Sequence, residues 1–90
     1  MPEITLQDGR TMDMQTWFRN IFIDARSFDY REIKESVMIM ATPREMTLST
    51  INTIIETIKL NGYKIDSSKM QFRAKTNTSF VFYLLLEKDL

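Results

Sequence analysis

The stretch Phe80-Val81-Phe82-Tyr83-Leu84-Leu85-Leu86 decides the fold, because seven consecutive apolar or aromatic residues must be buried. Successive side chains of a strand point to opposite faces of its sheet. The even-numbered residues of this stretch therefore share one face, and Val81, Tyr83 and Leu85 share the other. A strand with one solvated face would alternate with polar residues. Both faces need cover here, either from the rest of the chain or from a second molecule.

Length and composition predict a single domain, residues 1–90, without catalytic equipment. The chain of 90 residues contains neither cysteine nor histidine, which removes the usual thiolate and imidazole nucleophiles, bases and metal ligands. Its carboxylates show no paired spacing, and the two glycines, Gly9 and Gly62, cannot build a phosphate-binding loop. We expect a non-enzyme with no catalytic residue, no cofactor and no metal.

The charges predict weak long-range attraction to nucleic acid and to membranes. Twelve basic residues balance twelve acidic ones, so the formal net charge is zero. No apolar run approaches the roughly 20 residues that span a bilayer, and the N-terminus lacks a signal-peptide pattern. We therefore expect a cytoplasmic protein that does not bind membranes.

The N-terminal half predicts a strand, a helix and a second strand. Residues 3–6 indicate a short strand that runs into an Asp-Gly turn. Asp13 can cap a helix that extends to about Arg26, with apolar residues at helical spacing. Residues 27–41 fit either a helix or a strand, and the continuous apolar run before Ala41 favours a strand over 35–41.

The C-terminal half predicts a helix and two strands. Thr42-Pro43-Arg44-Glu45 has the residue types of a helix N-terminus with a capping box, and Asn61-Gly62 has those of a helix end. Two strand segments, 63–65 and 70–74, follow around a polar turn at 66–68. A further turn at 75–78 leads into the apolar stretch as a hairpin.

This order, β-α-β-α-β-β, predicts an α+β domain. Its sheet is mainly antiparallel with three to four strands, and two helices pack on one face. If the first helix instead crosses to the second face, the apolar strand is covered without a partner.

The segment 47–63 resembles the recognition helix of winged-helix regulators, in which a Ser-Thr pair opens the helix and a glycine closes it before a β-wing. The resemblance implies a helix over 28–40, a wing over 69–86 and binding to nucleic acid. This alternative, or a sheet-based platform with Phe72 as the stacking ring, would use the basic residues Arg44, Lys59, Lys69, Arg73 and Lys75.

Protein binding is the function that the sequence favours. Seven methionines and the strand with two apolar faces indicate an adaptable apolar surface. The residues we expect on it are Met38, Met40, Val81, Tyr83 and Leu85. The chain would be a small regulatory protein whose partner is another protein or a second copy in a homodimer. A short, methionine-rich chain of this kind is also compatible with a phage or plasmid product that binds a host protein, although no motif indicates this.

Overall fold

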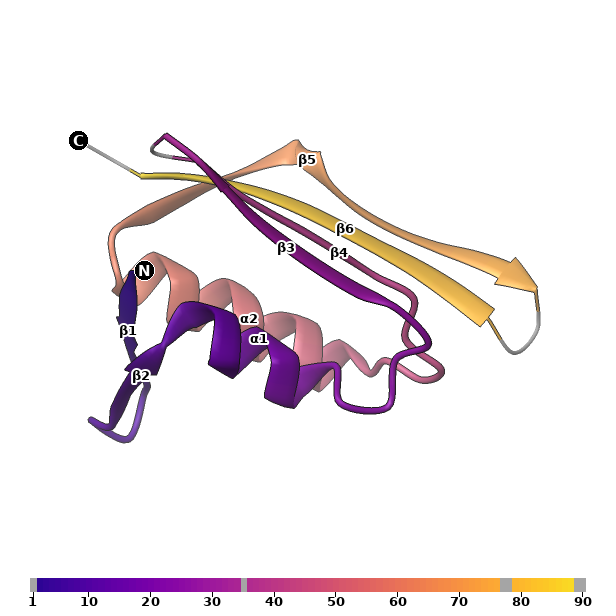
Figure 1. Ribbon diagram of the computed structural model, residues 1–90, viewed down its shortest axis with the longest axis horizontal. Coiled ribbons are helices and arrows are strands. Elements are labelled where there is room, and N and C mark those ends of the chain that lie inside the picture. The colour runs from indigo at the N-terminus through magenta and orange to yellow at the C-terminus, as the bar shows by residue number, and fades with distance from the viewer. Residues whose placement is uncertain (1, 35, 77–78, 89–90) are drawn as a thin grey trace.

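The computed structural model contains two helices and two antiparallel sheets, and it describes residues 2–34, 36–76 and 79–88 (Figure 1). At 66–69, 74–76, 79 and 88 it describes the backbone. The elements are β1 (Glu3–Thr5), β2 (Thr11–Asp13), α1 (Met14–Ile21), β3 (Phe28–Ile33), β4 (Ser36–Ala41), α2 (Leu48–Leu60), β5 (Tyr63–Thr76) and β6 (Ser79–Lys88). The predicted α+β class and the mainly antiparallel sheet are confirmed.

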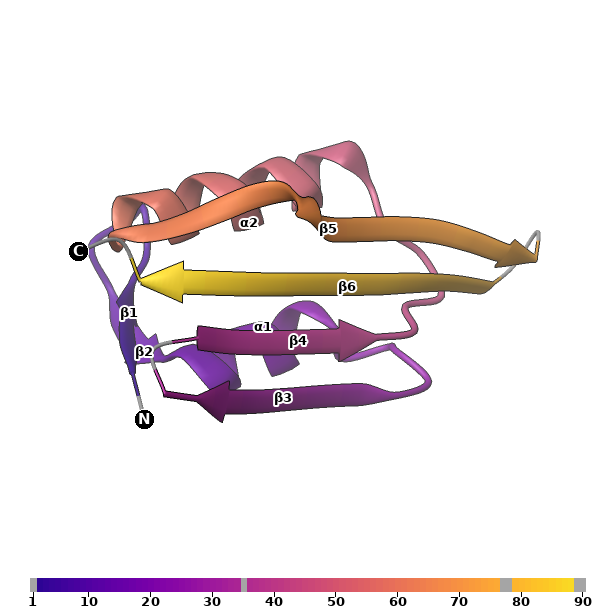
Figure 2. The same cartoon turned by 90° about the horizontal axis from the view of Figure 1, so that it is seen from above.

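The main sheet has the strand order β3-β4-β6-β5, and all neighbouring strands are antiparallel. Both helices lie on the same face of this sheet, which we call the helix face (Figure 1). The opposite face, which we call the outer face, is covered by no element of the described chain (Figures 1 and 2). The apolar stretch that decides the fold lies in β6, between β4 and β5.

The core lies between the helix face and the two helices. Strand β6 contributes Phe82, Leu84 and Leu86, each at most 1% exposed. The Phe22 ring, just after α1, stands 5.2 Å from the Phe82 ring, and Ile58 of α2 is fully buried. Alternate residues of β4 and β6 therefore meet the helices, as period-2 patterning requires.

Helix α1 begins where the sequence predicts and ends earlier. Asp13 caps it, and its Oδ2 accepts the Thr16 N–H at 3.2 Å. The helix stops at Ile21 rather than near Arg26, because the chain must turn into β3. The Arg26 N–H already donates to the Thr42 carbonyl at 2.9 Å, which ties this segment to the end of β4.

Strands β3 and β4 pair as an antiparallel hairpin, so the strand expected over 35–41 is confirmed for residues 36–41. Strand β4 matches the expected strand closely, whereas β3 was not predicted. The winged-helix alternative is wrong, because it requires a helix over 28–40. Phe28 and Tyr30 alternate with Asp29 and Arg31, and this period-2 pattern lets β3 bury one face while its other face stays polar.

Helix α2 begins at Leu48, six residues after the predicted cap at Thr42. That prediction is wrong because the Thr42 hydroxyl is engaged elsewhere: its Oγ1 accepts the Ser27 N–H at 2.9 Å. Thr47 caps the helix instead, and its Oγ1 accepts the Thr50 N–H at 3.2 Å. The predicted end is confirmed, with Asn61 at the C-cap and Gly62 at φ +80°.

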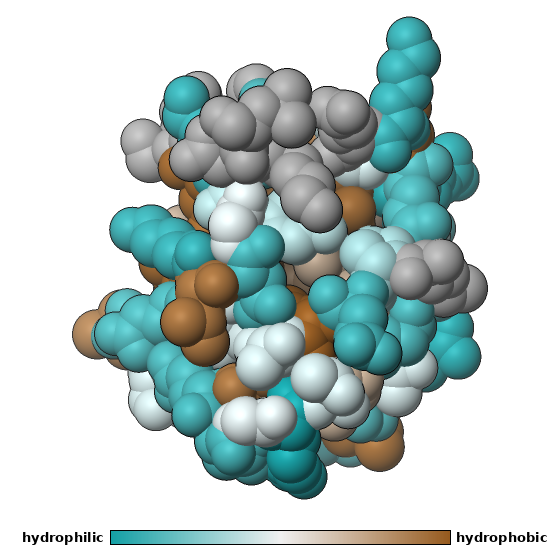
Figure 3. Space-filling view, turned by 90° about the vertical axis from the view of Figure 1, so that its left-hand side faces the viewer, coloured by the Kyte–Doolittle hydropathy of each residue, from teal (hydrophilic) through white to brown (hydrophobic). Residues whose placement is uncertain are grey.

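Strand β5 runs without a break, so the predicted turn at 66–68 is wrong. The register of β5 against β6 shifts between Ile65 and Met70, and β5 pairs with β6 on both sides of this irregularity. The predicted N-terminal strand exists as β1, but it pairs with β2 in a separate two-stranded sheet. This hairpin lies at one end of the helix layer, where the surface is mostly hydrophilic with small separate hydrophobic patches (Figure 3).

Candidate functional site

The outer face brings together the five side chains that the sequence predicts for protein binding. In the strand register Met38 lies opposite Leu85, and Met40 lies opposite Tyr83. Val81 follows two residues before Tyr83 on the same face of β6. The five residues therefore form one apolar strip along β4 and β6, which we call the outer strip.

The outer strip is accessible to a partner. Met40 is 42% exposed, and Met38, Val81, Tyr83 and Leu85 are each partly exposed. Their neighbours on the same two strands, such as Ile39 and Leu84, are fully buried against the helices. The strip is two strands wide, about 5 Å between backbones, and about 14 Å long from Val81 to Leu85.

Polar side chains border the outer strip on both sides. On β3, Asp29 lies opposite Met40 and Arg31 lies opposite Met38. The Arg31 Nε stands 3.2 Å from the Asp29 Oδ2. On β5, Gln71 lies opposite Tyr83 and Arg73 lies opposite Val81, and both are exposed. The result is an apolar centre with a polar rim, the usual anatomy of a protein interface.

The sequence interpretation missed this rim on the β3 side, because it assigned no strand to residues 28–33. The signal that identifies it is the alternation of Phe28 and Tyr30 with Asp29 and Arg31. Ile33, which is 56% exposed, also lies on the outer face and was not predicted. It lies opposite Ser36, at the hairpin end of β3.

The residues of the nucleic-acid alternative do not converge. Arg44 precedes α2 and Lys59 lies near its other end, so they are separated by most of the helix, which is about 20 Å long. Arg73 lies on the outer face, whereas Phe72, its neighbour, faces the helix side of the sheet and stacks on Phe80 at 5.3 Å. The side chains of Lys69 and Lys75 lie outside the described residues. Ring and cation therefore do not form a shared stacking surface at Phe72 and Arg73.

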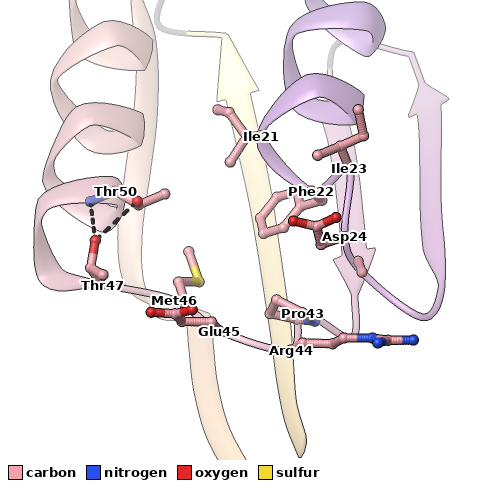
Figure 4. Close-up of a pocket in the computed structure, with 11 residues that line it drawn as sticks. Ile21, Phe22, Ile23, Asp24, Pro43, Arg44, Glu45, Met46, Thr47 and Thr50 are labelled. Carbon is pink, nitrogen blue, oxygen red and sulfur yellow. Dashed lines mark hydrogen bonds between the residues drawn. The ribbon is translucent and has the colours of Figure 1, made fainter.

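A cleft of about 680 Å³ opens between the C-terminal end of α1 and the N-terminal end of α2 (Figure 4). Its lining consists of Ile21, Phe22, Ile23, Asp24, Ala25, Pro43, Arg44, Glu45, Met46, Thr47 and Thr50. The charged members of this lining are exposed. The hydrogen bonds drawn there join Thr47 to Thr50 and cap the N-terminus of α2 (Figure 4). The hydroxyls of Thr47 and Thr50 are therefore engaged in the helix cap.

The titratable groups with shifted pKa values lie apart from the outer strip. Burial, with a hydrogen bond from the hydroxyl to Glu32 Oε1 at 2.9 Å, raises the pKa of Tyr30. Burial also raises the pKa of Tyr63. A backbone hydrogen bond from Arg10 lowers the pKa of Asp8. Among the described residues no cluster of acidic side chains could hold a metal ion.

Comparison of the chain with protein-family models, with curated proteins and with solved structures gave no match. Of the helices in the described residues, neither is long and apolar enough to cross a membrane.

Proposed function

We propose that this chain is a small non-catalytic regulatory protein that binds another protein through the outer strip. The observation that carries the proposal is the position of Met38, Met40, Val81, Tyr83 and Leu85. They form one continuous apolar surface on the face of the sheet that neither helix covers. Contiguous exposed apolar surface with a polar rim marks interaction sites in soluble proteins.

The shape of the outer strip favours an amphipathic helix as the partner element. A helix that packs on a sheet lies about 10 Å above it and covers roughly two strands. The strip is two strands wide and about 14 Å long, which matches the apolar face of a helix of two to three turns. Polar residues on β3 and β5 would flank such a helix on both sides.

The charges of the rim favour acidic residues on one flank of that helix. Arg73 on β5 is exposed beside Val81 and faces the same side as the strip. On the other flank Arg31 is paired with Asp29, which leaves a balanced charge there. A helix with its acidic flank over β5 would gain charge-assisted hydrogen bonds to Arg73.

The two methionines let the strip adapt to its partner. Methionine has three rotatable bonds and a polarizable sulfur, and it is overused at binding surfaces that accept varied sequences. Met38 and Met40 occupy the β4 half of the strip, while Tyr83 offers a rigid ring with a polar tip on β6. A host protein with an exposed amphipathic helix is the class of partner that this combination fits.

The experiment is a selection of displayed amphipathic helical peptides on the wild-type protein, followed by binding measurements on matched variants. Tyr83→Glu places a charge at the centre of the strip, and we expect selected peptides to bind this variant at least about tenfold more weakly. Leu60→Glu is the control, because Leu60 is 63% exposed on α2, which packs against the other face of the sheet. Peptides that bind Tyr83→Glu as tightly as the wild type would contradict the proposal, as would a selection that returns no binder.

A further inference from the structure

Strand β3 forms a free edge of the main sheet. It pairs with β4 on one side, and none of the described residues pairs with its other side (Figure 2). Helix α1 lies beneath β4 in this view and does not extend past β3 (Figure 2). The edge is therefore open to another strand, which is the situation in which sheets extend between molecules.

The backbone of β3 shows which groups point outward from this edge. The Thr42 N–H donates to the Ser27 carbonyl at 3.0 Å, and this pair continues the register of β3 and β4. Hydrogen-bonding direction alternates along an antiparallel strand. The backbone groups of Asp29 and Arg31 thus point toward β4, and those of Phe28, Tyr30 and Glu32 point to the free edge.

The charges of β3 are symmetric about Tyr30 with opposite sign. Asp29 precedes it and Arg31 follows it, and both side chains are well exposed, at 48% and 65%. If two copies of β3 pair in antiparallel fashion with Tyr30 opposite Tyr30, each Asp29 lies opposite the Arg31 of the second copy. These are pairs without backbone hydrogen bonds between them, in which the side chains approach most closely.

Three other registers that satisfy the same backbone groups bring like charges together, and the register centred on Phe28 removes both Asp–Arg pairs. Moving the symmetry axis by one residue places Asp29 opposite Asp29, or Arg31 opposite Arg31. Moving it by two residues toward the hairpin places Glu32 opposite Glu32 and removes both Asp–Arg pairs. Like charges directly opposite one another destabilise strand pairing, so the sequence of β3 supports one self-pairing register and opposes its neighbours.

We propose that a second copy of this chain binds along β3 and extends the sheet to eight strands. The register centred on Tyr30 provides three hydrogen-bonded residue pairs, or about six backbone hydrogen bonds, and two reciprocal pairs of Asp29 with Arg31. The twofold axis is perpendicular to the sheet, so both outer strips lie on the same side. Their centres are about 19 Å apart, which is four strand spacings. The dimer would thus present two helix-binding surfaces side by side, but its formation uses other residues and does not depend on that function.

Charge exchange tests the proposal directly, with the molar mass measured by light scattering from roughly micromolar to millimolar concentration. We expect the wild type to dimerise. Asp29→Arg alone places two arginines opposite each other, and Arg31→Asp alone places two aspartates opposite each other, so each should dimerise at least about tenfold more weakly. A mixture of these two variants should form a heterodimer, and the double exchange in one chain should restore the homodimer. Misfolded chains could not regain dimerisation. A restored dimer would therefore show that the single variants lost strand pairing and not their fold.

A single introduced cysteine tests the register, because the chain has none of its own. Tyr30→Cys should form a disulfide-linked dimer on oxidation, since directly opposite residues lie about 5.5 Å apart. Glu32→Cys is the control, because its two copies would lie about 14 Å apart. Three results would overturn the proposal. The wild type could stay monomeric at every concentration, or the single charge variants could dimerise as well as the wild type. Glu32→Cys could also cross-link in place of Tyr30→Cys. Tyr83→Glu changes the outer strip and not β3, so it should leave the dimer intact. The dimer and the helix-binding function of the outer strip can therefore fail independently of each other.

Discussion

Leu84 and Leu85 are adjacent residues of one type on opposite faces of β6, and replacing each by alanine tests the layer arrangement. Leu84 is fully buried, opposite Ile39 on β4 and Met70 on β5. Leu→Ala at such a site costs about 2–5 kcal/mol, so we expect about 3 kcal/mol of lost unfolding free energy. Leu85 is partly exposed opposite Met38, and its loss should cost about 1 kcal/mol.

Urea unfolding at low protein concentration measures this difference. A gap of about 2 kcal/mol corresponds to roughly 1 M in the urea midpoint, or to about 8–16 °C in Tm for a domain of this size. The low concentration matters, because a second molecule on the outer face would bury Leu85. Equal losses for the two variants would refute the reasoning, since they would mean that the outer face is as fully covered as the helix face.

Two further substitutions test the attachment of the N-terminal hairpin and the environment of Tyr30. Asn61, the C-cap of α2, exchanges two hydrogen bonds of 2.8 Å with the backbone of Thr5 and donates to the Thr57 carbonyl at 2.7 Å, so Asn61→Ala should cost about 2 kcal/mol in urea unfolding. Asn52→Ala, at an exposed position within α2, should change stability by less than about 0.5 kcal/mol. The pKa of Tyr30 is raised above its ordinary value of about 10 by burial and by Glu32, so the folded state keeps the phenol proton where the unfolded chain loses it. This stabilisation is complete below about pH 10 and is lost as the pH rises above it. In unfolding titrations across this range, Tyr30→Phe should lose less unfolding free energy than the wild type. An equal loss in both proteins would exclude Tyr30 as the source of the pH dependence.

The sequence predicts correctly those parts of the fold where a local residue pattern is compatible with only one type of structure. The apolar stretch over 80–86 requires a central strand, and Asn61-Gly62 ends a helix because Gly62 accepts a positive φ without strain. The start of α2 was wrong for a tertiary reason. Thr42 has the side chain of a helix cap, but its hydroxyl bonds Ser27, 15 residues earlier, and local spacing does not reveal this contact.

Of the outer strip and its polar rim, the sequence predicted only the apolar residues. Met38, Met40, Val81, Tyr83 and Leu85 follow from alternation on two central strands, so the sequence alone identifies them. Their polar border could not be predicted in the same way. It depends on strand order, since β3 borders β4 and β5 borders β6 in the sheet, and on a bulged β5 whose polar residues suggested a turn.

The distribution of apolar residues over the four strands favours binding over simple solvation of the outer face. Beside the outer strip the edge strands carry Asp29, Arg31, Gln71 and Arg73 on this face, and exposed Ile33 lies beyond them at the hairpin end of β3. Between Ser36 and Glu87 at one end and the β5–β6 connection at the other, the outer face of the two central strands carries methionine, valine, tyrosine and leucine. Polar residues there would preserve the core equally well, because these side chains do not contact the helices. Exposed apolar surface on a sheet promotes aggregation, so it has a cost unless a partner covers it. The opposed charges of β3 fit the proposed dimer: they would disfavour the adjacent pairing registers and would match in the register centred on Tyr30. An edge that selects a second copy and a central strip one helix wide would together make a bivalent receptor for helices from a chain of 90 residues.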